Sequence, residues 1–445
     1  MALNVAMQGG RTLDSWKEIA AYLDRGIRTV QRWERELGLP VHRLEGKKRG
    51  AILAYPAELD AWVEAHSSQL RQNDETRPNW ALRLALASAA LVTLLGATAL
   101  ATRQGWFRGQ PHSVVVHSSE LRVLDDHGRE LWNHTFNFPL VEAIYTAGAN
   151  THPPRRYSFV SDLDGDGEVE VLFIPYAPAA SDLPRRELIC FDSRGRVRWR
   201  YQPARPVHFG DETFEPPFPV DAFFLPDFPN QPPGHLWLVS HHARWFPAVV
   251  TKLDFNGQVL AEFWHGGHVE VLKEAELDRR RVLLVGATNN EQTSAALAVL
   301  DAGNPEGSSP AVSPNYQCLD CPAGEPLLYL VFPRTALSRA VASRPTIYEI
   351  WAKRNGQVEL AVNEAKANPP AAAGPSYSFD SQFRLQSAGL VDPYLSLHAE
   401  LQKQGLLKQP LDRQREEKRL HNIRYWNGRE FVPYAGYVEA LAARR

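Results

Sequence analysis

Cysteine is scarce in this chain, with three in 445 residues. That number excludes a disulfide framework of the kind that holds small secreted domains together. Cys318 and Cys321 form an isolated CLDC pair, without a second pair to complete a zinc site. A local disulfide, if this segment lies outside the cytoplasm, and a pair of inert thiols both remain open.

The common catalytic signatures are also missing. We find no nucleophile elbow, metal triad or phosphate-binding loop, so we do not expect an enzyme. The cluster HGGH (265–268) could bind a metal ion. Because no carboxylate stands at a defined spacing from it, we interpret it as structural or surface histidine. The same interpretation applies to the other histidines of this region, His208, His235, His241 and His242.

Chain length and proline content say more about the number and type of domains than the net charge does. The formal net charge is -2, but the charges are unevenly placed along the chain. A chain of 445 residues is too long for one ordinary core, so at least two domains are expected. Most of the 33 prolines follow residue 110, which is typical of a loop-rich β domain.

The longest uncharged stretch is LALASAALVTLLGATALAT (84–102). A helix of this length spans about 28 Å, close to the hydrocarbon thickness of a bilayer. Arg83 and Arg103 flank it, and Trp106 and Phe107 suit the headgroup interface. A buried core helix would show a polar stripe, and this stretch has none. We predict a transmembrane helix.

Two short helices are predicted before it. LDSWKEIAAYL (13–23) has apolar residues at helical spacing, and Ser15 with Glu18 forms a capping-box pattern. DRGI (24–27) predicts a turn, with Gly26 available for a positive φ. RTVQRWERELG (28–38) predicts a second helix, followed by a hairpin at 41–55 and a third helix at 56–66.

This pattern resembles the winged helix-turn-helix domains of the MerR and excisionase type. The matching pieces are KEIAAYL, RTVQRWERELGLP, the basic turn EGKKRG and the helix that begins near Tyr55 and Pro56. The chain lacks the long dimerisation helix and the metal-binding cysteine of typical MerR sensors. The resemblance, which covers about 55 residues, implies binding of double-stranded DNA through residues 13–55.

Charge supports this interpretation independently. Residues 25–49 hold eight Lys or Arg against three Glu, a net of +5. Such a surface neutralises phosphates, and Arg or Gln on a helix in the major groove can contact base edges. The candidates for the groove or its rim are Arg28, Thr29, Gln31, Arg32 and Arg35. The candidates for backbone contacts through the wing are Arg43, Lys47, Lys48 and Arg49.

The remaining N-terminal segments complete a membrane topology. Residues 1–12 are expected to be a disordered tail, and the polar residues 67–83 a flexible linker. A DNA-binding domain requires a cytoplasmic N-terminus, so the C-terminal region would face the periplasm or exterior. Ala85, Ser88, Ala89 and Gly96 could let two spans pack, which is a reason to consider a homodimer.

The region 112–445 contains a loose repeat. ELRVLDDHGRELW (120–132) and ELICFDSRGRVRW (187–199) align without gaps, VTKLDFNGQVLAEFW (250–264) repeats them, and LAVLDAGNPEG (297–307) is a weaker copy. Each predicts a strand, an Asp-x-x-Gly turn and a second strand. With the apolar strands between copies, the spacing predicts a β-propeller of six or seven blades, closed with help from the hairpin at 421–432.

One loop of this region, SDLDGDGEVEV (161–171), is more specific. It resembles the calcium loops of FG-GAP and VCBS repeats in integrin-like propellers. Alternate carboxylates in a tight loop converge their oxygens, and hard oxygen donors suit Ca²⁺. The resemblance implies one structural ion, with a ligand from the backbone carbonyl of Glu168. An Asp/Gly-rich turn closed by its own hydrogen bonds is the alternative. The candidate ligands are Asp162, Asp164, Asp166, Glu168 and Glu170.

Together these features predict a multidomain protein: a small α+β winged helix-turn-helix (13–66), one transmembrane α-helix (84–102) and an all-β propeller-like domain (112–445). The order resembles that of bacterial membrane-tethered one-component regulators. It implies a single-pass protein of the cytoplasmic membrane that senses an unidentified extracytoplasmic ligand or protein and transduces the signal to transcription. The alternative is a membrane-anchored extracytoplasmic propeller that acts in binding or adhesion. Residues 393–419 predict a helix and a charged insertion, either solvated or an interaction surface.

Overall fold

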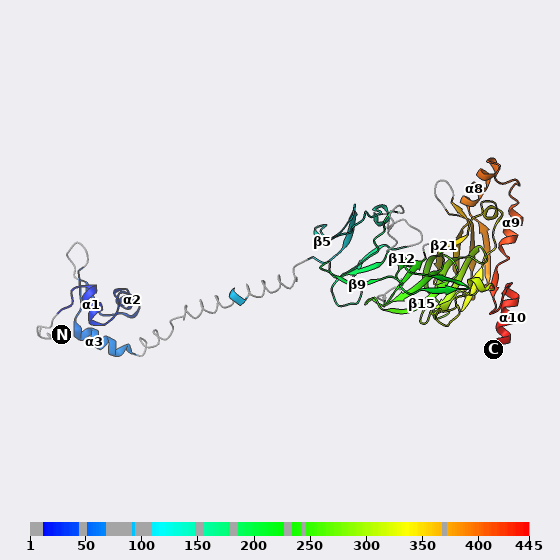
Figure 1. Ribbon diagram of the computed structural model, residues 1–445. Coiled ribbons are helices and arrows are strands. Elements are labelled where there is room, and N and C mark those ends of the chain that lie inside the picture. Colours follow the sequence, from blue (N-terminus) through cyan, green and yellow to red (C-terminus); the bar gives the residue numbers. More distant parts are fainter. Residues whose placement is uncertain are drawn as a thin grey trace. The chain divides into compact units, whose positions relative to one another are not determined.

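The computed structural model describes residues 12–43, 51–67, 91–93, 109–146, 155–178, 186–226, 234–242, 246–366 and 372–444. The chain divides into two compact units, Met1–Phe107 and Arg108–Arg445 (Figure 1). Short helices characterise the first unit and β-sheets the second, which confirms the mostly β character expected of the C-terminal region and the short helices expected before it.

The first unit begins with two helices, α1 (Trp16–Tyr22) and α2 (Ile27–Leu37). Ser15 caps α1, since its hydroxyl accepts the N–H of Glu18 at 3.2 Å. The Glu18 carboxylate in turn accepts the N–H of Asp14 at 2.9 Å, so the capping box is shifted by one residue from its usual partner. Gly38, with φ +67°, ends α2 in the left-handed conformation.

The turn between α1 and α2 differs from the expectation. Gly26 has a φ of -72° and serves as the N-cap of α2, so the prediction that it adopts a positive φ is wrong. Asp24 adopts the positive φ instead, at 51°. Asp is one of the few L-residues that tolerate this region, because its short polar side chain can form local hydrogen bonds.

A two-stranded antiparallel sheet and a third helix complete the described part of this unit. The sheet pairs β1 (His42–Arg43) with β2 (Ile52–Leu53), and α3 (Pro56–Ala65) follows with Pro56 in its first turn. Trp33 and Trp62 pack together with ring centroids 5.7 Å apart. The Trp62 indole N–H donates to the Leu37 carbonyl at 3.0 Å, which ties α3 to the end of α2.

The predicted transmembrane segment, 84–102, lies outside the described residues except for 91–93. Within the part of the chain that the structure describes, no helix has both the length and the apolar character needed to cross a membrane. Leu91 and Val92 are helical, with 56% and 68% of their surface exposed.

The second unit is built of antiparallel sheets that follow one another in chain order (Figure 1). The first three sheets hold the strands up to residue 265 other than β10 (Val207–Phe209) and β11 (Glu212–Phe214), and the third also includes the short parallel strand β19 (Gly307–Ser308). Their strands are β3 (Ser113–His117), β4 (Glu120–Leu124) and β5 (Glu130–Thr135); β6 (Ser158–Ser161), β7 (Glu170–Phe173), β8 (Leu188–Phe191) and β9 (Val197–Tyr201); and β12 (Val220–Phe224), β13 (Leu236–His241), β14 (Ala248–Leu253) and β15 (Val259–His265).

The fourth and fifth sheets hold most of the later strands. The fourth orders β16 (Val269–Leu277), β17 (Arg280–Asn289), β18 (Ser294–Asp301), β20 (Leu328–Val331), β27 (Arg424–Trp426) and β28 (Phe431–Val432). The fifth orders β21 (Thr346–Ala352), β22 (Val358–Asn363), β25 (Pro375–Phe379) and β26 (Leu385–Leu390). Two-stranded sheets are formed by β10 (Val207–Phe209) with β11 (Glu212–Phe214) and by β23 (Ala365–Lys366) with β24 (Ala372–Ala373).

Alternation along the strands explains how consecutive sheets stack. In β7, Val171 and Phe173 belong to the core shared with the first sheet, whereas Leu172 belongs to the core shared with the third. Because successive side chains of a strand point to opposite faces, a fully apolar strand can bury both of its faces. Stacking of small antiparallel sheets on both faces is the arrangement of propeller blades.

The predicted Asp turns join the last two strands of the first three sheets. In each turn a carboxylate oxygen of Asp125, Asp192 or Asp254 accepts two backbone N–H groups at 2.8–2.9 Å. The same turn recurs at Asp380 between β25 and β26, where Phe383, with φ 57°, replaces the glycine. This copy was missed because the glycine is the most visible mark of the repeat.

Two expectations about the repeats are wrong. Residues 297–307 do not form a hairpin, since β18 pairs with β17 and β20, and β19 (Gly307–Ser308) pairs in parallel with β15. The hairpin predicted at 421–432 is present as β27 and β28, but β27 pairs with β20 in the fourth sheet and not with a strand of the first sheet. The described residues contain five successive sheets of three or more strands, against the six or seven blades expected.

Helices of the second unit lie outside these sheets. In Figure 1, α8 and α9 run beside the sheet that contains β21. The predicted charged insertion at 393–419 consists of these two helices. The helical segments are α6 (Ala143–Thr146), a 3-10 turn at Pro314–Tyr316, α7 (Ala336–Ala340), α8 (Asp392–Lys403), α9 (Arg413–Leu420) and α10 (Tyr434–Arg444).

Candidate nucleic-acid interface and metal-binding loop

The candidate DNA-contacting residues lie on one helix because α2 buries its apolar side. Val30 and Trp33 are in the core of the unit, with 0% and 7% of their surface exposed. The helical period then directs Arg28, Arg32 and Arg35 to solvent. The two neutral candidates are less accessible, since Thr29 and Gln31 are half-buried.

Acidic neighbours engage some of these cations. Arg43, on β1, donates to the Glu34 carboxylate at 2.9 Å, and Arg32 lies 3.8 Å from Glu36. Arg35 donates to the carbonyl of Gln31 at 3.4 Å. Exposed pairs of this kind contribute little to stability, so these arginines can exchange a carboxylate for a phosphate at low cost.

Arg28 forms no ion pair with any residue that the structure describes, and it stands at the first turn of α2. A free guanidinium beside the N–H groups of a helix start presents donors to a phosphate or a base edge. The remaining wing candidates, Lys47, Lys48 and Arg49, lie outside the described residues.

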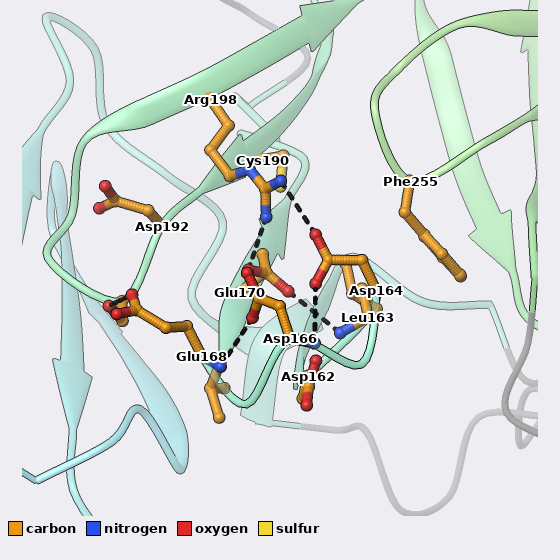
Figure 2. Close-up of polar contacts among 12 residues, drawn as sticks. Asp162, Leu163, Asp164, Asp166, Glu168, Glu170, Cys190, Asp192, Arg198 and Phe255 are labelled. Carbon is orange, nitrogen blue, oxygen red and sulfur yellow. Dashed lines mark hydrogen bonds and ion pairs between the residues drawn. The ribbon is translucent and has the colours of Figure 1, made fainter.

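The acidic loop brings three of its five candidate ligands together (Figure 2). The carboxylate oxygens of Asp162, Asp164 and Asp166 lie within 4.8 Å of one another. Ca²⁺ binds oxygens at 2.3–2.6 Å, so two ligands of one ion are at most about 5 Å apart. The three aspartates therefore fit a calcium ion without rearrangement of the backbone.

Backbone hydrogen bonds hold the loop in this shape. Asp162 accepts the N–H groups of Gly165 and Gly167 at 2.7 and 3.0 Å. Asp166 accepts the N–H of Glu168 at 2.8 Å. These bonds are those expected for the alternative, an Asp/Gly-rich turn that closes on itself, and they are also compatible with ion binding, because each carboxylate oxygen has two lone pairs.

The other two candidate ligands point elsewhere. The Glu168 carboxylate accepts the Ser193 hydroxyl at 2.6 Å, which leaves only its backbone carbonyl for an ion. Glu170 is 2% exposed, and its carboxylate accepts the Leu163 N–H at 3.0 Å and a guanidinium N–H of Arg198 at 2.6 Å. Burial raises the pKa of Glu170, an effect that the Leu163 N–H and Arg198 oppose.

Arg198, on β9, is the functional residue that the sequence analysis missed. It also donates to Asp164 at 3.0 Å, so its guanidinium lies between two candidate ligands (Figure 2). Partial burial of Asp164 favours its neutral form, but the hydrogen bonds from Arg198 and Asp166 outweigh burial and lower the pKa of Asp164. Arg198 therefore supplies a cation to the loop from the neighbouring strand β9. The sequence of β9, VRWRY, predicts an alternating strand but not this contact, because Arg198 is far from Asp164 and Glu170 in the sequence.

A second acidic group, Asp125, Asp126 and His127, also places its ligand atoms close together. Asp125 is 2% exposed and its oxygens accept N–H groups of His127 and Arg129. These bonds belong to the repeated turn of the first sheet, so we assign this group to turn formation.

Buried ion pairs link the second, third and fourth sheets. Arg155 donates to Asp221 at 3.0 Å and to Glu270 at 2.6 Å, and Asp221 is 2% exposed. Burial disfavours the charged form of Asp221, yet His241 and Arg155 lower its pKa well below the ordinary range. Breaking one partner of such a cluster would leave a buried charge without compensation, so the cluster specifies how these sheets pack.

The CLDC pair forms a disulfide between Cys318 and Cys321. The segment docks on β10 through Asp320, whose carboxylate accepts the His208 backbone N–H at 2.9 Å and lies 2.7 Å from its ring Nδ1. Other histidines also face carboxylates, since His235 lies 2.8 Å from Glu274. His265, of the HGGH cluster, instead lies 2.9 Å from the Tyr329 hydroxyl and is fully buried.

Comparison with known proteins gives only distant similarity in structure. No protein-family model and no curated protein matches the chain. Among solved structures, a protein of unknown function from Bacteroides caccae is similar over 64% of this chain and 95% of its own, at 10% identity and a TM-score of 0.21. The Dos1 propeller is similar over 62% of this chain and 65% of its own, at 8% identity and a TM-score of 0.27.

Drosophila Plexin A, solved in complex with Semaphorin 1b, is similar over 63% of this chain and 79% of its own, at 9% identity and a TM-score of 0.19. Such loose superpositions say nothing about ligands or partners of this chain. The propeller-like character of the C-terminal region rests on the strand order described above.

Proposed function

We propose that this protein is a membrane-tethered transcriptional regulator that binds DNA through residues 13–55 and senses a signal through its propeller-like second unit. The observation that carries the proposal is the exposed arginine side of α2, Arg28, Arg32 and Arg35, opposite the buried Val30 and Trp33. A helix that presents guanidinium groups in this way can enter a major groove and neutralise phosphates.

The order of elements in the first unit supports the finer part of the proposal. Two helices joined by residues 23–26, a two-stranded hairpin and a third helix follow the order of a winged helix-turn-helix of the MerR and excisionase type. In that arrangement α2 is the recognition helix and the loop between β1 and β2 is the wing.

The membrane tether rests on the sequence of residues 84–102. It contains no charged side chain, and Leu91 and Val92 are helical residues with exposed apolar side chains. Exposed leucine and valine in a long apolar helix are stable in lipid. With the DNA reader in the cytoplasm, the second unit is extracytoplasmic and the protein is a single-pass protein of the cytoplasmic membrane.

The acidic loop is proposed to hold one structural Ca²⁺ in this second unit. Asp162, Asp164 and Asp166 would supply carboxylate oxygens and Glu168 its backbone carbonyl. An ion there would crosslink the loop before β7 and stabilise the second sheet. A role in catalysis is not proposed.

DNA binding is tested with the purified full-length chain in a neutral detergent. Binding to labelled DNA from upstream of its own coding region is measured by fluorescence anisotropy across a salt series. We expect Arg28→Ala and Arg32→Ala each to weaken binding by about 1–3 kcal/mol, and a lost phosphate contact to reduce the salt slope by about 1.

Lys17→Ala is the matched control, because Lys17 is an exposed cation on α1 outside the proposed interface. It should bind as the wild type does. Absence of DNA binding by the full-length chain at low salt would overturn the regulator proposal. The alternative, a membrane-anchored propeller that binds an extracytoplasmic partner, would then stand in its place.

A further inference from the structure

A pocket of about 380 Å³ opens in the second unit where α7, α9 and the segment between α8 and α9 meet. This volume is within the range of pockets that bind small molecules, about 300–1,000 Å³. The pocket belongs to the second unit and shares no residue with the acidic loop, and neither of the roles proposed above uses it.

Cations dominate the polar lining of this pocket. Arg339 comes from α7, Lys408 from the segment after α8, and Arg415 and Arg419 from α9. The pKa of Arg339 is lowered. Burial is the largest cause, and repulsion from the positive charge of Arg419 is the second. The lining is therefore short of negative charge.

The two acidic residues in the lining are already engaged. The Asp412 carboxylate caps α9 by accepting the Arg415 backbone N–H at 3.0 Å. Glu416 accepts the Ala336 N–H at 3.0 Å with one oxygen, and a guanidinium N–H of Arg419 at 2.5 Å with the other. Neither carboxylate forms an ion pair with Arg339, Lys408 or Arg415, although the charges of Glu416 and Glu364 partly oppose the lowering of the Arg339 pKa.

These three cations form no ion pair with any residue in the described ranges. The guanidinium of Arg339 donates to the Arg334 carbonyl at 3.0 Å, which fixes its position without neutralising it. The side chains of Lys408 and Arg415 make no hydrogen bond within the described part of the chain. Cations gathered without counter-charges at the mouth of a pocket attract an anion.

A histidine of α8 adds a hydrogen-bonding group to the lining. His398, on α8, lines the pocket although only 3% of its surface is exposed. Its ring nitrogens make no hydrogen bond to any group that the structure describes. Neither ring nitrogen is a fully buried atom without a partner. The imidazole is therefore an additional hydrogen-bonding group of the lining, and it can contact a ligand oxygen as well as water.

Apart from Gln409, the rest of the lining is apolar. Leu407 is 9% exposed, and Leu406, Pro410 and Leu411 extend this surface toward solvent. We propose that the pocket binds a small organic carboxylate with an apolar group, its charge on Arg339 and Arg415, its apolar part on Leu407 and Leu411, and a hydrogen bond from His398. Guanidinium groups match the planar geometry of carboxylates.

The carboxylate proposal rests on the proposed function only in one respect: it names small carboxylates as the class of signal that the second unit would sense. The test contains no DNA, and the DNA test contains no carboxylate, so either idea can fail while the other stands.

The test is isothermal titration calorimetry of the purified full-length chain with phenylacetate, hexanoate and benzoate, each at up to about 20 mM. We expect at least one of them to bind saturably with a Kd below about 1 mM. Its amide, for example phenylacetamide, should bind at least about tenfold more weakly, because a neutral group forms weaker hydrogen bonds with guanidinium than a carboxylate does.

Variants locate the binding. Arg339→Gln and Arg415→Gln should each weaken carboxylate binding about tenfold, and His398→Phe should weaken it by a smaller factor. Arg413→Gln is the matched control, because Arg413 lies on α9, pairs with Glu417 at 2.7 Å and does not line the pocket. Melting temperatures report whether each variant is folded, and both Arg339 and Arg415 are exposed enough to be replaced without loss of the core.

The proposal is overturned if none of the three carboxylates binds, if the amide binds as tightly as the acid, or if Arg413→Gln weakens binding as much as Arg415→Gln does. It is supported if binding is saturable, requires the charge and is weakened by the pocket variants but not by Arg413→Gln.

Discussion

At the scale of single residues, Arg198 determines how the acidic loop behaves. Its guanidinium bonds Asp164 and Glu170, so two of the five candidate calcium ligands already have a cation. An arriving Ca²⁺ must either share these oxygens with Arg198 or use only Asp162, Asp166, the other oxygen of Asp164 and the Glu168 carbonyl. Arg198 therefore limits the affinity for the ion while it stabilises the loop without one.

Replacing Arg198 should separate these two roles. In Arg198→Gln, Glu170 would remain buried without its charged partner, so without calcium the free energy of unfolding should fall by about 1–3 kcal/mol. The extra negative charge should raise calcium affinity about tenfold. Thermal unfolding of the full-length chain, with added Ca²⁺ or with a chelator, measures both changes.

Arg200→Gln is the matched control for this change. Arg200 is on the same strand and pairs with Glu187, away from the loop. Its replacement should change neither stability in chelator nor the calcium response by more than about 0.5 kcal/mol. If calcium stabilises neither the wild type nor Arg198→Gln, the loop is a turn closed by its own hydrogen bonds.

The sequence indicated the aspartates but could not indicate Arg198. Asp162, Asp164 and Asp166 lie at alternate positions of one loop, so their convergence follows from local spacing. Arg198 reaches them from β9, and only the pairing of β7 with β8 and of β8 with β9 brings it near. Contacts of this kind depend on register, which a single sequence leaves open.

At the scale of elements, the Asp turns connect neighbouring sheets as well as neighbouring strands. The turn glycine of the second sheet, Gly195, packs on the ring of Trp132 from the first. Gly257 of the third sheet packs in the same way on Trp199 of the second, whose indole N–H donates to the Phe255 carbonyl at 2.8 Å. The repeated tryptophan of the sequence is thus explained by docking between sheets.

This docking predicts a difference between two equivalent glycines. Gly128 and Gly195 have φ values of +75° and +80°, so alanine at either position should cost about 1–2 kcal/mol from the left-handed backbone alone. A Cβ at Gly128 meets nothing within 4 Å, whereas one at Gly195 would lie 2.7 Å from the Trp132 ring. Gly195→Ala should therefore cost a further 1–3 kcal/mol, roughly, from overpacking.

Urea unfolding of the two variants, followed by tryptophan fluorescence, measures this difference directly. Gly128→Ala is the control for backbone strain, and subtracting its effect isolates the contact with Trp132. Equal losses of stability in the two variants would show that the contact between the first and second sheets does not contribute to folding.

Elements were predicted well where local pattern decides them. The capping residues of α1 and α2 and the Asp turns follow from short-range chemistry, and they appear where expected at Ser15, Gly38, Asp192 and Asp254. The partner of β27 was not predictable in this way. Its pairing with β20 spans the whole fifth sheet and three helices, and no local signal specifies it.

At the scale of the whole molecule, the disulfide bears on the compartment of the second unit. The sequence left open whether Cys318 and Cys321 are bonded, and the structure joins them. Disulfides persist outside the cytoplasm and are generally reduced within it. A stable Cys318–Cys321 bond in cells is therefore expected only if residues 84–102 carry the second unit across the membrane, as the proposed topology requires.

Alkylation in rapidly acid-quenched cells tests this topology. After denaturation, a large maleimide should label the wild type once without reductant, at the buried free thiol Cys190, and three times after reduction. A chain without residues 84–102 should be labelled three times in both conditions, because its second unit would stay in the reducing cytoplasm. Cys318→Ser with Cys321→Ser should be labelled once throughout and so assigns the bands. Triple labelling of the wild type without reductant would place the second unit in the cytoplasm, the same compartment as the proposed DNA-binding domain. Residues 84–102 would then not separate the two units by a membrane.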